Sequence, residues 1–204
     1  HEYTHIIHLD KVDGVPSWFR DIFGRFRLLG QIPFVFPNSF NPEWFIEGLA
    51  QYEETDVKAE VGRGQSTYYR MLMRMELMHG LKPVDKISQP VTVWPDGTTS
   101  YLYGIYFFNF IRDTYGEEKI YQWIEWYSSN VIPYRLDSAS LELFGKGIHD
   151  LWDEYEAWLA AQFQPEIDRV NEQGMVAGER LTETGIATGK CDCLDDGTLF
   201  YMVD

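Results

Sequence analysis

The chain begins with the pattern His-Glu-Tyr-Thr-His, in which two histidines stand four positions apart and a glutamate follows the first. On a helix, residues four apart project from one face about one turn apart. Two neutral imidazoles at this spacing can bind one zinc ion, and the adjacent Glu2 can take a proton from a water molecule. The pattern therefore predicts a helix over about residues 1–11 that carries His1 and His5 as zinc ligands and Glu2 as a general base.

A catalytic zinc ion needs a third protein ligand and an open position for water. One known solution is HExxHxxGxxH, but here His8 stands at the glycine position and Lys11 at the position of the last ligand. The other solution is a glutamate from a second helix. Glu47 is such a candidate, because its neighbours are apolar and a carboxylate among them would be costly to bury unless a cation neutralised it. Those neighbours are Trp44, Phe45, Ile46, Leu49 and Ala50.

The segment WFIEGLAQYEE resembles the WxxEGxAxYxE motif of gluzincin zinc peptidases, the aminopeptidase N group among them. The resemblance implies that Glu47 is the third zinc ligand and that Glu54 supports the ligands from behind, although a solvated charge is an equal alternative for Glu54. Downstream, the segment from Tyr101 to Gly104 is similar to the YxxG motif of the same family. That similarity implies that Tyr101 stabilises the oxyanion, with packing as the alternative.

The HExTH, FGR and WFIEGLA segments resemble more closely the bacterial peptidase-MA-like proteins that continue into a β-propeller. The gap between His5 and Glu47 is longer than in aminopeptidase N, and the GxMEN substrate motif of the aminopeptidases is not in the sequence. Exopeptidase activity is therefore not supported. The first residue already belongs to a motif, so we expect the chain to be a piece of a longer protein. For its location the resemblance suggests the bacterial periplasm, envelope or exterior.

The remaining sequence predicts a mainly α fold, which the resemblance identifies as the helical lobe of a thermolysin-like (gluzincin) metallopeptidase domain over residues 1–164. Apolar residues at helical spacing and capping signals predict several further helices. Asn41 is the expected cap of a helix over residues 42–54, and the last helix is expected over about residues 148–163. Residues 165–204 contain short runs separated by glycines, which is typical of strands and turns. We expect them to begin a β domain, and DDGTLFY resembles the start of a propeller blade.

The charge of the chain limits its partners. Lys and Arg total 17 against 32 Asp and Glu, which gives a formal net charge of −15. Such a surface repels phosphate backbones and anionic lipids, so we expect neither nucleic acid nor membrane binding. No apolar run approaches the ~20 residues of a membrane span. The expected partner is a peptide or protein substrate.

Several other candidate residues have simpler interpretations. His8 lies two turns from His1, too far to share an ion, so packing is favoured. His79 and His149 follow no ligand spacing and are expected to be structural or exposed. Cys191 and Cys193 alternate on an expected strand, where two buried side chains are favoured over a metal pair.

These patterns together predict a hydrolase: zinc-dependent peptide hydrolysis, with zinc held by His1, His5 and Glu47, Glu2 as the base and Tyr101 at the oxyanion. The sequence also allows a degenerate or zinc-stabilised peptidase-like domain that acts as a binding module, or a hydrolase of non-peptide substrates. It is compatible with either an active or an inactive site in this piece alone.

Overall fold

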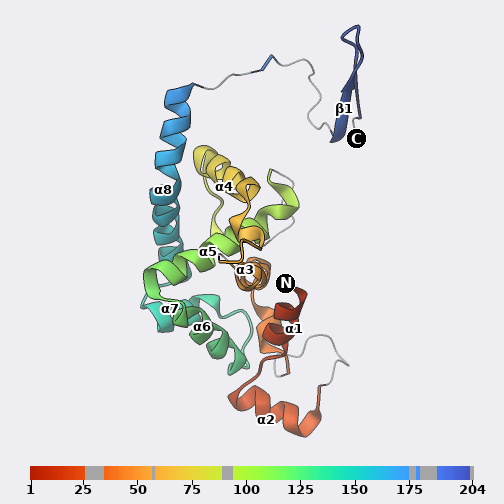
Figure 1. Cartoon of the computed structure of the whole chain (residues 1–204). Coiled ribbons are helices and arrows are strands. Elements are labelled where there is room, and N and C mark those ends of the chain that lie inside the picture. The colour runs from red at the N-terminus through yellow and green to blue at the C-terminus, as the bar shows by residue number, and fades with distance from the viewer. Residues whose placement is uncertain (26–34, 57, 89–93, 175–177, 180–187, 203–204) are drawn as a thin grey trace. The chain divides into compact units, whose positions relative to one another are not determined.

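The computed structural model describes residues 1–25, 35–56, 58–88, 94–174, 178–179 and 188–202 (Figure 1). The chain divides into two compact units, His1–Ile167 and Asp168–Asp204. The first is built of helices, and the β structure described is a two-stranded sheet near the C-terminus. The prediction of a mainly α fold with a short C-terminal β segment is confirmed. Of the helices that the structure describes, none is long and apolar enough to span a membrane.

Helix α5 (Thr99–Tyr115) forms the centre of the helical unit, where it crosses α3 (Glu43–Glu54), as Figure 1 shows. Its sequence is apolar on all sides, which is typical of a helix that is covered all round. The crossing with α3 depends on two glycines. A Cβ atom on Gly104 would lie 2.2 Å from the carbonyl oxygen of Trp44, and one on Gly48 would lie 2.5 Å from Cα of Gly104. The two helices therefore meet backbone to backbone.

Helix α1 (Glu2–Asp10) packs against α3 and against the short 3₁₀ helix η1 (Pro37–Phe40). Asn38 of η1 is fully buried and ties this corner together. Its side-chain Nδ2 donates to the carbonyl of Lys11 and to Oγ of Ser128 on α6 (Glu118–Ser128). The orientation of α1 is thus fixed from its C-terminal end.

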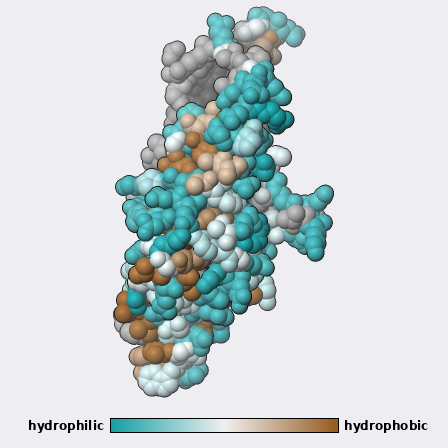
Figure 2. Space-filling view, turned by 90° about the vertical axis from the view of Figure 1, so that its left-hand side faces the viewer, coloured by the Kyte–Doolittle hydropathy of each residue, from teal (hydrophilic) through white to brown (hydrophobic). Residues whose placement is uncertain are grey.

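Helix α2 (Gly14–Phe23) begins where the Asp13 side chain accepts a hydrogen bond from the amide of Gly14. Its apolar residues recur at helical spacing and several are exposed: Val15, Trp18, Ile22 and Phe23. Figure 2 shows hydrophobic side chains at the lower end of the molecule, where Figure 1 places α2. Residues 26–34, which follow α2 in the segment between His5 and Glu47, lie outside the described residues.

The prediction that Asn41 caps α3 is wrong. The helix begins at Glu43, Pro42 precedes it, and no side chain caps its first turn. Asn41 is buried, and its Nδ2 donates instead to the carbonyl of Asn38. Burial of an amide requires a hydrogen-bond partner, and η1 provides it.

The other helices surround α5. Helix α4 (Thr67–His79) packs directly on α5, while α7 (Leu136–Phe144) packs on α6, which itself contacts α5. Short 3₁₀ helices connect them: η2 (Arg63–Gln65), η3 (Val84–Lys86) and η4 (Asp96–Thr98). Trp152 and Tyr155 of the last helix stack on Phe107 of α5 and close the aromatic core.

The last helix, α8 (Ile148–Gln173), continues ten residues beyond the predicted end at Phe163 and passes through Pro165. Proline removes one backbone hydrogen bond and usually ends a helix. Here the next turn is held by side chains, because Ile167 is buried and Glu166 pairs with Arg70 and Arg74 of α4. Residues 165–173, expected to begin the β domain, are therefore helical.

The C-terminal hairpin pairs β1 (Thr188–Cys193) antiparallel with β2 (Leu199–Met202), with Cys193 opposite Leu199. Its turn is closed by Oδ1 of Asp196, which accepts from the amide of Thr198. Cys193 is a free, exposed thiol, so the prediction that it is buried is wrong. The side chain of Cys191 lies outside the described part, and the propeller remains a prediction.

Candidate metal centre

Helix α1 brings the two predicted histidine ligands together. The Nε2 atoms of His1 and His5 lie 3.2 Å apart, and their rings meet edge to face with centroids 4.7 Å apart. Both side chains are partly buried, with 15% and 17% of their surface exposed. The spacing of four residues thus produces the shared face that the sequence predicted.

Helix α3 adds a carboxylate to this pair. Oε2 of Glu47 lies 3.3 Å from Nε2 of His1 and 3.3 Å from Nε2 of His5. Among the described residues, these three form the one group of His, Cys, Asp and Glu side chains whose ligand atoms all lie within 4.8 Å of one another. The packing of α1 on α3 therefore joins residues that are more than forty positions apart in the sequence.

The geometry of this triangle fits a zinc ion. Two ligands of a tetrahedral zinc at ~2.0–2.1 Å from the ion are about 3.3 Å from each other. The three edges here measure 3.2, 3.3 and 3.3 Å. In addition, Oε2 of Glu47 is buried and accepts no hydrogen bond from the residues that the structure describes. A buried carboxylate oxygen without a donor is costly, and a cation at this position would satisfy it.

Glu54 lies behind His1. Its Oε2 is 3.2 Å from Nδ1 of His1, the ring nitrogen opposite the one that faces Glu47. A carboxylate in this position is typical of metal-binding histidines, because it accepts the Nδ1 proton and leaves Nε2 free for the ion. Burial acts to raise the pKa of Glu54, but the hydrogen bonds and charge of Arg63 lower it overall. Of the two alternatives for Glu54, the geometry favours the supporting position.

Tyr101, at the beginning of α5, lies beside the cluster. Its ring stacks on that of His1, with centroids 6.3 Å apart and planes at 26°. Burial and the charge of Glu47 raise the pKa of Tyr101, so the phenol keeps its proton at neutral pH and can donate a hydrogen bond. The Gly48–Gly104 crossing sets this arrangement, since each glycine is within three residues of one of the two functional side chains.

Glu2 occupies the first turn of α1 and is exposed. Within the described part of the chain it has no hydrogen-bond or ion-pair partner, so no contact fixes its carboxylate away from the cluster. Its position next to His1 is the one that a general base for a water molecule on this face requires.

The other histidines do not join the cluster. His8 is buried and packs against Phe45, with ring centroids 6.0 Å apart. Burial and the charge of His5 lower the pKa of His8 to about 4, against a smaller opposing effect of Asn38. Nδ1 of His79 meets the carbonyl of Met75 within α4, and the exposed His149 lies near Asp85. The packing role expected for His8 agrees with its burial.

Sequence reasoning missed Arg63. Its Nε and Nη2 donate to the two oxygens of Glu54 at 2.7 and 3.2 Å, and Nη2 lies 2.9 Å from Nδ1 of His1. The guanidinium also lies over the ring of Tyr101, 5.7 Å from its centroid. The one available signal was local: Arg63 stands between Gly62 and Gly64, and glycines on both sides allow a backbone to approach another element closely.

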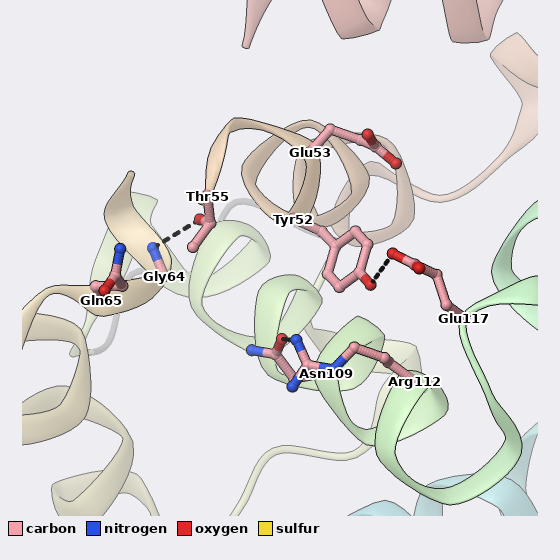
Figure 3. Close-up of a pocket in the computed structure, with 8 residues that line it drawn as sticks. All are labelled: Tyr52, Glu53, Thr55, Gly64, Gln65, Asn109, Arg112 and Glu117. Carbon is pink, nitrogen blue, oxygen red and sulfur yellow. Dashed lines mark hydrogen bonds between the residues drawn. The ribbon is translucent and has the colours of Figure 1, made fainter. Parts of the chain in front are cut away.

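A pocket of about 380 Å³ lies at the C-terminal end of α3, next to η2 (Figure 3). Tyr52 donates to Glu117 across it at 2.8 Å, and the amide of Gly64 donates to Thr55 at 3.2 Å. Gly64 and Gln65 directly follow Arg63, so η2 contributes to both the pocket and the surroundings of His1. Of the described residues that line the pocket, none is a predicted zinc ligand or catalytic residue.

No protein-family model, curated protein or solved structure matches this chain. An assignment of function therefore depends on the residues and their geometry.

Proposed function

We propose that this chain is the helical catalytic domain of a gluzincin-type zinc peptidase and that it hydrolyses peptide bonds. One observation carries the proposal: two imidazole nitrogens and one carboxylate oxygen, from two helices, form a triangle with edges of 3.2–3.3 Å. Glu54 behind His1 and Tyr101 beside it add the supporting groups that such a site uses.

In this proposal His1 and His5 bind zinc through Nε2 and Glu47 through Oε2. The bound ion supplies Lewis acidity, which polarises a peptide carbonyl and lowers the pKa of a water molecule toward ~7. Glu2 takes the proton from the attacking water and delivers it to the nitrogen of the leaving amine. The Tyr101 hydroxyl donates a hydrogen bond to the carbonyl oxygen as negative charge develops on it.

The Glu2→Gln variant tests the proposal, because it removes the base and leaves the ligands in place. We expect one zinc per chain in both proteins, and cleavage of a mixed peptide library about a hundredfold slower or worse in the variant. Glu118→Gln is the matched control, since Glu118 is also the exposed first residue of a helix. Undiminished cleavage by Glu2→Gln would exclude the mechanism.

The wild-type protein separates the proposal from its main alternative. Zinc binding without cleavage of any peptide in the library would identify a peptidase-like binding module. A wild-type protein that binds no zinc would exclude both.

A further inference from the structure

Arg63 contacts three groups of the candidate centre at once: His1, Glu54 and Tyr101. Its side chain is 44% exposed, so burial of the side chain does not hold it there. The contacts are directional: two N–H groups reach the two oxygens of one carboxylate, and the face of the guanidinium covers an aromatic ring. Such two-pronged pairing fixes a carboxylate more firmly than a single contact does.

The backbone around Arg63 is built to bring it close to α3. Asp56 and Val61 form a small antiparallel bridge with hydrogen bonds of 3.1 and 3.2 Å, which turns the chain back after α3. Gly62 has a φ of +98°, and a Cβ atom there would lie 2.5 Å from Cα of Thr55. The segment before Arg63 is thereby fixed to the same end of α3 that carries Glu54.

The residue after Arg63 is equally close to α3. A Cβ atom on Gly64 would lie 2.7 Å from Oγ1 of Thr55 and 2.8 Å from Cδ1 of Ile105. The Gly64 amide donates to Oγ1 of Thr55, which itself donates to the carbonyl of Gln51. Arg63 is therefore held on both sides by glycines that no larger residue could replace without a shift.

The chemistry of His1 shows what Arg63 can do. A histidine that binds a metal through Nε2 carries its proton on Nδ1, so Nδ1 must find an acceptor. Two groups reach Nδ1: Oε2 of Glu54 at 3.2 Å and Nη2 of Arg63 at 2.9 Å. Arginine has donors only, so Glu54 alone can accept the proton. The contribution of Arg63 must then pass through the carboxylate that it holds.

We infer that Arg63 is a positioning residue: it holds the Glu54 carboxylate against Nδ1 of His1, which directs Nε2 of His1 toward the metal. This inference rests on the proposed zinc site. It goes beyond that site because it assigns a role to a loop residue that neither binds the ion nor touches the substrate.

The test compares zinc affinity among variants of the whole chain by competition with a chelator. Arg63→Met is expected to weaken zinc binding about tenfold, as is typical when the group that supports a ligand is lost. Arg63→Lys, which keeps the charge but not the two-pronged geometry, is expected to weaken it about threefold or more. Arg70→Met is the matched control, since Arg70 is also half exposed and paired with a glutamate, Glu166. Its zinc affinity should equal that of the wild type.

A double-mutant cycle distinguishes positioning from a general loss of structure. If Arg63 acts through Glu54, Arg63→Met should change zinc affinity less than about twofold when Glu54→Gln is already present. The absorption spectrum of bound Co²⁺ should change in Arg63→Met and stay the same in Arg70→Met. Thermal unfolding with a chelator present identifies a misfolded variant, in which case Arg63→Lys carries the test.

Three results would overturn the inference. They are unchanged or tighter zinc binding by Arg63→Met, the same fold-loss in the presence and absence of Glu54, and a Co²⁺ spectrum identical to that of the wild type. If the wild type itself binds no zinc, the proposed function fails together with the inference. If the wild type binds zinc and the Arg63 variants are unaffected, the inference fails alone.

Discussion

Gly48 of α3 and Gly104 of α5 lie in direct backbone contact, with the Cα of each inside the space that a Cβ on the other would need. Gly48 directly follows the candidate ligand Glu47, and Gly104 is three residues after Tyr101. The contact therefore sets how far the carboxylate on one helix lies from the phenol on the other. Both glycines belong to the segments that resemble peptidase motifs, and the crossing gives a physical reason for a small residue at each position.

We expect Gly104→Ala to lower the free energy of unfolding by about 1–3 kcal/mol, because the added Cβ would force the helices apart. Zinc affinity should fall with it, since Glu47 moves with α3. Gly97→Ala is the control, as nothing lies within 4 Å of a Cβ at that position. Urea denaturation measures the difference, and equal stability of the two variants would show that the crossing can relax.

The Glu47→Gln variant should lose the stabilisation that zinc provides. For one site, ligand at a hundred times Kd stabilises the folded state by about 2.7 kcal/mol. We expect a gain of this size in the wild type when zinc replaces chelator, and none in Glu47→Gln. Glu43→Gln is the matched control, one turn earlier on α3 and exposed. A zinc-dependent gain in Glu47→Gln equal to that in the wild type would contradict the ligand assignment.

Tyr101→Phe should reduce kcat by about a hundredfold and leave KM and zinc content nearly unchanged, because the hydroxyl acts where charge appears in the transition state. The ring that stacks on His1 is kept in this variant. Tyr134→Phe, at a residue that is 79% exposed, controls for the loss of a phenol elsewhere. A change confined to KM would indicate that Tyr101 binds substrate but does not stabilise the oxyanion.

The metal ligands could be predicted from the sequence because their positions depend on local rules. A spacing of four residues produces one helix face, and an acidic residue among apolar neighbours indicates a neutralising cation. The structure brings His1, His5 and Glu47 together as these rules anticipate. Zinc binding and catalysis remain predictions, which the experiments above address.

Features that depend on tertiary contacts could not be predicted in the same way. An arginine in a polar loop looks like a solvated charge, and only the folded chain brings Arg63 to Glu54 and His1. The continuation of α8 through Pro165 has the same origin, because Glu166 is held by arginines ninety-two and ninety-six residues away. Local propensity favoured a helix end there, and packing overrode it.

Lys82→Met should destabilise the fold strongly. Nζ of Lys82 and the hydroxyl of Tyr103 both donate to Oε2 of Glu76, whose residue is 3% exposed. Removal of the ammonium leaves a buried carboxylate without a cation, which costs about 3–5 kcal/mol. The exposed Lys86→Met is the control. The double variant Lys82→Met, Glu76→Gln should be less destabilised than Lys82→Met alone, and a larger loss in the double variant would count against a charge effect.

His8 should make the fold sensitive to acid. The ring is buried, and burial followed by the charge of His5 lowers the pKa of His8 from 6.5 to about 4. The unfolded chain therefore binds more protons than the folded chain between these two pH values, and the free energy of unfolding falls as the pH decreases through that window. The full shift corresponds to about 3 kcal/mol, and the loss levels off below about pH 4.

The comparison of wild type with His8→Met isolates this effect, because methionine fills a similar space and does not titrate. Both proteins are unfolded with urea from pH 7 to pH 4 in the presence of a chelator, so that loss of metal from His1, His5 and Glu47 does not contribute. We expect the difference in the free energy of unfolding to change in favour of His8→Met as the pH falls, mostly between pH 6.5 and 4. A difference that stays constant across this range would mean that His8 is protonated as easily in the folded chain as in the unfolded one.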